Sequence, residues 1–261
     1  MDVSTSQHGT DDTRARGRAA RTGGALFLVF IAAELTLVLS PLIVLVPFAV
    51  ADPSLTEGAP LSPAPLVAIL VIPPVFAALV AVAGTALFGA GPRQGRVRRE
   101  LAWNWNWRDT FRGLSFGVAG LVITIPAAAV WASWVGADKA ESAVGEVFKG
   151  EQLGIVAGLI AFLGVWLIAP LCEEVMFRGV LWRTFEHWRW HGWVIFAVTT
   201  VVFSVAHMEL LRTPLLLVLS IPIGLARLFT RNLTASVVAH QVNNFLPALA
   251  LLFSTTGILA S

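Results

Sequence analysis

The chain has 261 residues, of which 56% are hydrophobic and only 13% are charged, and its mean hydropathy is +0.76. A soluble domain usually carries about 25% charged residues because its surface has to stay hydrated. The composition therefore excludes an ordinary soluble protein and predicts an integral membrane protein. The net charge of +2 is small and no nucleic-acid-binding motif accompanies it, so we expect no nucleic-acid partner. The single cysteine, Cys172, excludes an intramolecular disulfide.

The first 22 residues are polar and basic, and the apolar run from residue 23 to residue 50 follows them. That run is too long for the apolar core of a signal peptide, which has about 7–15 residues. We therefore interpret residues 1–22 as a polar, basic, cytoplasmic tail before an uncleaved first span. Residues 23–150 are expected to form N-terminal transmembrane helices that carry no recognised motif.

Long uncharged or nearly uncharged runs recur along the whole chain, and a membrane-spanning helix needs roughly 17–25 apolar residues. We expect an all-α fold, a polytopic transmembrane bundle of about seven spans, with six and eight as the limits. The segment 213–230 is the least secure because it is short and contains Pro222. The candidate spans are 24–50, 64–90, 111–136, 153–172, 192–208, 213–230 and 232–259.

The segments between these spans alternate in charge. The tail and the segment around residues 93–99 are rich in arginine, whereas the segment 138–151 is rich in acidic residues. Arg227 and Arg231 are assigned to a further basic connection. Basic loops face the cytoplasm, so we expect a multi-pass protein of the cytoplasmic membrane whose N-terminus lies inside.

Ionisable side chains inside a bilayer are costly, about 2.5–3.5 kcal/mol for Arg, Lys or Asp, and they commonly mark function. The sequence C-E-E-V-M-F-R contains Glu173, Glu174 and Arg178. On a helix Glu174 and Arg178 are neighbours that can pair. Glu173 lies about 100° around the helix, free for another partner. The alternative is a charged end where the fourth span meets water.

Two further polar groups interrupt later apolar runs. His207 ends the sequence F-S-V-A-H, and H-Q-V-N-N contains His240 and Asn244, which share a helix face. The structural alternative for these residues is hydrogen bonding between helices, and Asn243 is the competing amide. Glu34, an unpaired carboxylate in the first span, matches no motif.

Glu173 and His207 lie at equal distances from Trp190, 17 residues before it and 17 after it. If both stretches are helical, the two side chains reach the same depth, about 25 Å from the turn at Trp190. This arrangement requires the fourth helix to continue past Cys172, whereas Pro170 is a point at which it could end.

Taken in order, E-E-x-x-x-R at 173–178, F-x-x-x-H at 203–207 and H-x-x-x-N at 240–244 resemble the CPBP family. This family comprises CAAX prenyl proteases and bacteriocin-processing enzymes, and is also called the Abi family. The resemblance covers roughly residues 153–251. It implies that residues 151–261 form the catalytic transmembrane core of an intramembrane endopeptidase.

The resemblance also implies a role for each motif residue. Glu173 would activate the hydrolytic water with help from His207. His240 and Asn244 would polarise the scissile carbonyl and bind the developing oxyanion. Glu174 and Arg178 would pair to shape the site. The catalytic residues implied are thus Glu173, Glu174, Arg178, His207, His240 and Asn244.

This set of side chains is chemically sufficient for peptide hydrolysis, which needs a base for water and donors for the oxyanion. We expect a glutamic-type endopeptidase with no cofactor and no metal. The alternative is a zinc-dependent version of the same peptidase, with Glu173, His207 and His240 as ligands, because such a set is compatible with zinc. The motif H-E-x-x-H is absent from the sequence, which favours the metal-free mechanism.

Two other classes of protein remain as alternatives. A proton-coupled transporter would use Glu34, Glu173, His207 and His240 as titrating groups, but the sequence shows no inverted repeat. A non-catalytic immunity or scaffold protein of the Abi type would keep the motifs without cleavage. The expected partners are the lipid bilayer and a peptide or protein substrate, lipidated or membrane-embedded.

Overall fold

The computed structural model describes residues 4–258, and its side chains are described from residue 13 onward except at 137 and 138. All regular elements in this range are helices, which confirms the predicted all-α fold. The elements are α1 (Ser4–Ala51), η1 (Pro53–Glu57), α2 (Pro63–Phe88), α3 (Arg96–Glu100), α4 (Trp107–Val135), α5 (Ala137–Ala140), α6 (Ala143–Val147), α7 (Ile155–Leu163), η2 (Gly164–Ile168), α8 (Ala169–Glu174), η3 (Val175–Leu181), α9 (Trp182–His187), α10 (Gly192–Ala206), α11 (Thr213–Thr230) and α12 (Leu233–Thr256).

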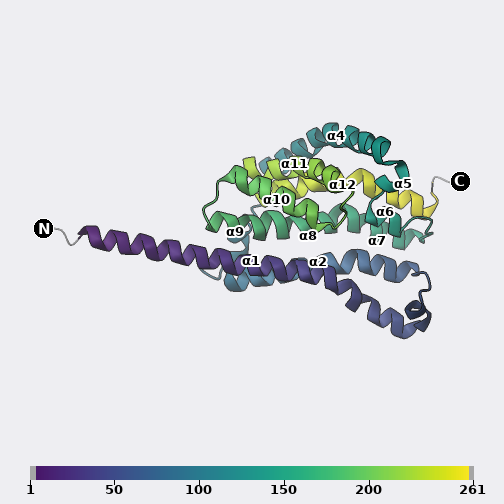
Figure 1. Ribbon diagram of the computed structural model, residues 1–261, viewed down its shortest axis with the longest axis horizontal. Coiled ribbons are helices and arrows are strands. Elements are labelled where there is room, and N and C mark those ends of the chain that lie inside the picture. The colour runs from purple at the N-terminus through teal and green to yellow at the C-terminus, as the bar shows by residue number, and fades with distance from the viewer. Residues whose placement is uncertain (1–3, 259–261) are drawn as a thin grey trace.

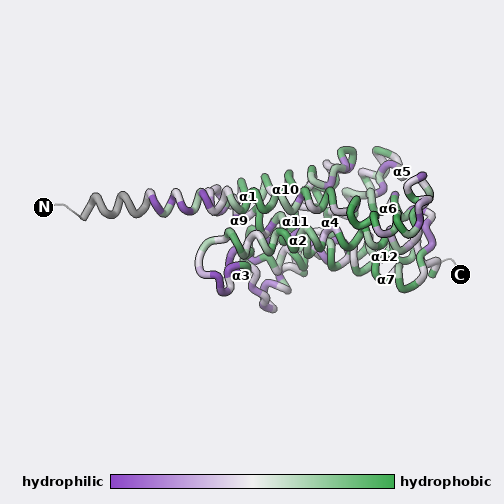
Figure 2. Tube along the Cα trace, turned by 90° about the horizontal axis from the view of Figure 1, so that it is seen from below, coloured by the Kyte–Doolittle hydropathy of each residue, from purple (hydrophilic) through white to green (hydrophobic). Residues whose placement is uncertain are grey.

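Within the described residues, six helical stretches are long and apolar enough to cross a membrane. They are Thr13–Ala51, Pro63–Phe88, Trp107–Val135, Ile155–His187, Thr213–Thr230 and Leu233–Thr256. The number of spans agrees with the predicted range of six to eight, but the prediction that 213–230 is the least secure span was wrong. The 18 residues of α11 suffice for a span despite Pro222, whereas α10 is the short apolar helix, with 15 residues. Figure 2 shows hydrophobic residues along the middle of the bundle and polar residues gathered at its two ends.

The fourth helix runs without interruption from Ile155 to His187, beyond the predicted end at residue 172. Two π-helical segments, η2 and η3, flank α8, which begins at Ala169 and has Pro170 in its first turn. A proline lacks an N–H donor, and local π adjustment lets a membrane helix continue past it. Glu173, Glu174 and Arg178 therefore lie inside the bundle, so the interpretation of these charges as the end of a span was wrong.

The long helix from α7 to α9, called the central helix below, lies between two groups of helices. One side of it packs against α1 and α2, and the other packs against α12, beyond which α11 and α4 follow (Figure 1). The contact of α4 with α12 is close because Gly113 faces α12. A Cβ at Gly113 would lie 2.4 Å from the carbonyl oxygen of Ala235. Small residues permit such close approach between membrane helices, which pack without help from water.

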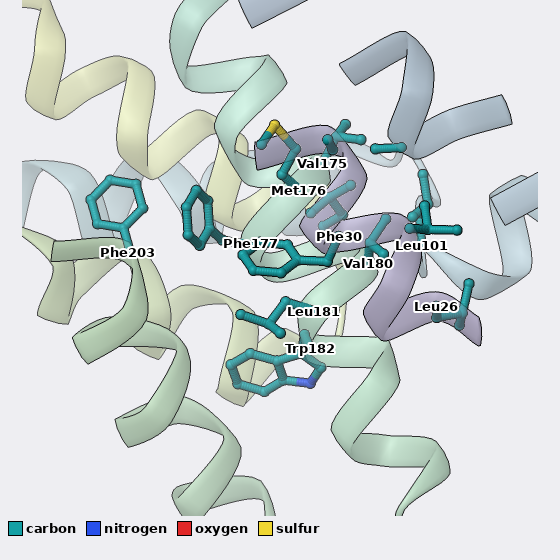
Figure 3. Close-up of a cluster of buried hydrophobic side chains, with 14 of the residues drawn as sticks. Leu26, Phe30, Leu101, Val175, Met176, Phe177, Val180, Leu181, Trp182 and Phe203 are labelled. Atoms are coloured by element: carbon teal, nitrogen blue, oxygen red, sulfur yellow. The ribbon is translucent and has the colours of Figure 1, made fainter. Parts of the chain in front are cut away.

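Aromatic side chains join α1, the central helix and α10 in the apolar core. The ring of Phe30 on α1 meets the ring of Phe177 edge-on, with centroids 5.3 Å apart. Phe177 meets Phe203 of α10 in the same way at 5.2 Å. Figure 3 shows these residues with their aliphatic neighbours. This core fixes the position of α1 and α10 relative to the charged residues of the central helix.

A buried carboxylate ties α3 to the end of the central helix. Glu100 Oε2 accepts a hydrogen bond from Arg183 Nε at 3.1 Å and lies 2.8 Å from His187 Nε2. Burial raises the pKa of the Glu100 carboxyl, but the hydrogen bonds from His187 and Arg183 and their charges outweigh this effect. They hold the pKa below its ordinary value of 4.5.

Replacing Glu100 by Gln is expected to lower the thermal unfolding midpoint at pH 7 by roughly 5 °C, because a hydrogen bond to a charged group contributes about 1.5–3 kcal/mol. The depressed pKa means that the carboxylate contributes its full stability above pH 4.5 and loses it as the pH falls through the folded-state pKa. Melting curves of both proteins in detergent should therefore converge at low pH. A difference in melting temperature that stays constant down to about pH 3 would contradict the role given to the Glu100 carboxylate.

Candidate active site

The centre of the site is a buried ion pair on the central helix. Arg178 donates from one terminal nitrogen to Glu174 Oε1 at 2.9 Å, and both side chains are inaccessible to solvent. The second terminal nitrogen donates to the hydroxyl of Ser220 on α11 at 2.6 Å. The guanidinium carbon also lies 4.4 Å from the centre of the Phe203 ring. The pair predicted from the i,i+4 spacing is therefore present, and neighbouring helices enclose it.

His240 of α12 connects this ion pair to Glu173. Its Nδ1 lies 3.1 Å from Glu174 Oε1, and its Nε2 lies 3.7 Å from Glu173 Oε2. A carboxylate oxygen only accepts hydrogen bonds, so Nδ1 carries the proton toward Glu174. Glu174 thus fixes the orientation of the imidazole, and Nε2 points to the side of the site where Glu173 lies.

The two adjacent glutamates differ in their access to solvent. The side chain of Glu173 is 22% exposed, whereas that of Glu174 is fully buried. Glu174 is also engaged by Arg178 and His240, as described above. Of these two carboxylates, Glu173 is the one that a water molecule or a substrate can reach.

His207 lies at the end of α10 and joins the site through Phe203. Its Nδ1 donates to the carbonyl oxygen of Phe203 at 2.8 Å, which leaves Nε2 of the neutral ring as an acceptor. The Phe203 ring lies 4.6 Å from the His207 ring and 5.6 Å from the His240 ring. The phenylalanine of the motif F-x-x-x-H therefore contacts both histidines as well as Arg178.

The structure distinguishes the two neighbouring asparagines of α12. Asn243 is buried and accepts a hydrogen bond from Thr124 Oγ1 of α4 at 3.2 Å, so it connects the two helices. Asn244 is partly exposed, and its amide donates to the carbonyl of Val165 in η2 at 3.3 Å. Asn244 lies one turn beyond His240. The bond to Val165 uses one N–H of the amide, and the second N–H is available to an oxyanion.

Two residues that support the site were not predicted. Ser220 carries no sequence signal, because a serine in an apolar helix is common and only the fold places it against Arg178. Arg227 was assigned to a connection between spans, and this was wrong. It lies within α11 with 1% of its surface exposed, and its Nε donates to the backbone carbonyl of Arg178 at 3.1 Å. The signal available was its place inside the apolar segment 213–230.

A zinc site would require the predicted alternative ligands, Glu173, His207 and His240, to converge. Among the residues whose side chains are described, no group of three or more His, Cys, Asp and Glu side chains is arranged to hold a metal ion. Both histidines engage Nδ1, with Phe203 and with Glu174, and this leaves Nε2 of each ring available. Within the described side chains, the three predicted ligands are therefore not assembled into a metal site.

Comparison with known proteins shows that the motif-bearing segment is similar to a known family. Residues 155–246 match the family described as type II CAAX prenyl endopeptidase Rce1-like. The matched segment is about a third of the chain. The match contains all six candidate residues and confirms the resemblance found from the three motifs. Comparison with curated proteins and with solved structures gave no significant match.

Proposed function

We propose that this chain, whose residues 155–246 match the type II CAAX prenyl endopeptidase Rce1-like family, hydrolyses peptide bonds inside the membrane with water activated by Glu173. One observation carries the proposal. Of the two adjacent glutamates in this buried cluster of charges, only Glu173 is accessible to solvent. His240, which Glu174 orients, faces the Glu173 carboxylate. This arrangement provides a base beside a hydrogen-bond donor.

In the proposed reaction the Glu173 carboxylate takes a proton from water as the water oxygen attacks the scissile carbonyl carbon. The carbonyl oxygen becomes an oxyanion. When the tetrahedral intermediate collapses, the C–N bond breaks and the proton passes from Glu173 to the leaving amine. His207 assists through Nε2, the acceptor nitrogen of its neutral ring. No side chain forms a covalent bond with the substrate.

The oxyanion is stabilised by donors from α12. His240 donates from Nε2, which requires protons on both ring nitrogens, and the Glu174 carboxylate faces the first of them. Asn244 supplies the second donor through the amide N–H that the Val165 carbonyl does not use. Removing one such donor typically reduces kcat by about 10²–10³-fold, so these contacts matter as much as the base.

The substrate proposed is a peptide or protein with a prenylated C-a-a-X end, reached from the bilayer in which the enzyme is embedded. The protein would be a multi-pass protein of the cytoplasmic membrane with its N-terminus inside. The N-terminal part of α1 and the basic segment at α3 lie at the same end of the bundle (Figure 2). This supports the proposed orientation because basic loops face the cytoplasm.

A peptide panel tests this function. Purified wild-type protein in liposomes would be incubated with C-a-a-X peptides in prenylated and unprenylated forms and with unrelated apolar peptides. We expect cleavage that is fastest for the prenylated forms, unaffected by chelators, in a preparation without stoichiometric zinc. Bound zinc with chelator-sensitive cleavage would overturn the metal-free mechanism. No cleavage of any peptide would overturn the endopeptidase function and favour the transporter or scaffold alternatives.

A further inference from the structure

Glu34 on α1 is an ionisable residue that the proposed mechanism does not use. It lies within the first span, and its Oε1 is buried without a hydrogen-bond partner. A charged carboxylate at the centre of a membrane helix costs several kcal/mol, about 2.5–3.5 for Asp. Among the described side chains Glu34 has no cation beside it, so a polar group on a neighbouring helix is needed to accept or donate a hydrogen bond.

The aromatic core gives the register between α1 and the central helix. These two helices run in opposite directions (Figure 1), and Phe30 meets Phe177 edge-on. Glu34 follows Phe30 by four residues, and Glu173 precedes Phe177 by four residues. Because residues four apart share a helix face, both carboxyl groups lie one turn from the same ring contact, in the same direction.

This register brings the two carboxyl groups within the range at which two negative charges repel each other. The other ionisable groups that face Glu173 are His240 from α12 and, from its own helix, Arg178 and the Cys172 thiol. Arg178 donates its hydrogen bonds to Glu174 and Ser220 and none to Glu173. Two carboxyl groups that share a site of low polarity are compatible when one of them holds a proton.

We propose that Glu34 is a positioning residue whose protonated carboxyl group donates a hydrogen bond to the carboxylate of Glu173. The inference rests on the proposed function and adds to it a residue from the N-terminal helices, outside the segment that matches the family. This hydrogen bond holds the Glu173 side chain in the orientation that receives the proton from water. It also explains why a carboxyl group in the first span has no cation beside it.

Kinetics of three variants on α1 test the positioning role. Glu34→Leu removes the donor, and we expect kcat to fall roughly 10- to 100-fold with KM unchanged, as for other losses of orientation. Glu34→Gln keeps an N–H donor and is expected to restore kcat to within a few-fold of wild type. Leu35→Ala, at an exposed neighbouring position, is the matched control and should not change kcat. Wild-type kcat in Glu34→Leu, or equal loss in the Leu and Gln variants, would overturn the proposal.

A spectroscopic readout separates this inference from the proposed function. Infrared spectra of wild type should contain the carbonyl stretch of a protonated carboxylic acid. We expect Glu34→Gln to remove this band and Glu173→Gln to displace it, whether or not a peptide is cleaved. If the bands behave so but no peptide is cleaved, the carboxyl pair stands and the endopeptidase function fails. A band that is absent, or unchanged in Glu173→Gln, would overturn the pairing of Glu34 with Glu173.

Discussion

Replacing Glu173 by Gln is expected to reduce kcat for peptide cleavage by about 10²–10⁴-fold, the usual contribution of a general base. The amide has nearly the shape of the carboxylate but does not accept a proton from water. KM should change little, because the substituted atoms act on the water and not on the bound peptide. Steady-state kinetics of the purified variant in liposomes measure both quantities.

The control for this prediction is that the variant remains folded. Glu173 is partly exposed, and its nearest approach to His240 is 3.7 Å, longer than a hydrogen bond. The substitution should therefore leave the melting temperature within a few degrees of wild type. A variant that unfolds at the wild-type temperature and keeps kcat within threefold would show that Glu173 is not the base.

Replacing Arg178 by Met is expected to destabilise the protein by about 3–5 kcal/mol, the range measured when one partner of a buried ion pair is removed. Methionine fills much of the space but removes the guanidinium that donates to the Glu174 carboxylate and to the Ser220 hydroxyl. Cleavage should also be lost, because His240 is oriented by the same carboxylate. Thermal or denaturant unfolding in detergent measures the first effect.

The matched control is the double variant Arg178→Met with Glu174→Gln, in which neither charge is left alone. It should recover part of the stability that the single variant loses, because an uncompensated buried charge is the main cost. Cleavage should stay low in the double variant, since the carboxylate that orients His240 has been replaced by an amide. Equal stability of the two variants would contradict the account of the ion pair.

Much of the fold followed from the lengths of the apolar runs, because the bilayer sets a minimum span for a helix. The errors in the predicted fold concern two local features, the end of the fourth helix and the length of α10. The central helix continues through Pro170 with the help of two π-helical segments, and periodicity does not reveal a π segment. The short helix α10 was taken for a span because its apolar run includes residues beyond Ala206, where the helix ends.

For the candidate site, the order and spacing of the motifs predicted six residues. The structure brings four of them, Glu173, Glu174, Arg178 and His240, into contact. Contacts between helices were the part that sequence did not provide. No spacing rule relates Ser220 to Arg178, 42 residues away, or Glu34 to Glu173. Such pairs depend on which helix faces which, and this depends on the packing of the whole bundle.

The most direct test of the central claim is to identify the products of one prenylated C-a-a-X peptide by mass spectrometry after incubation with wild type and with Glu173→Gln in matched liposomes. The account predicts that wild type breaks a single peptide bond near the C-terminus and adds one water. The variant should leave the peptide intact over the same time. An intact peptide with wild type, or the same products with both proteins, would contradict the claim that Glu173 activates water for peptide hydrolysis.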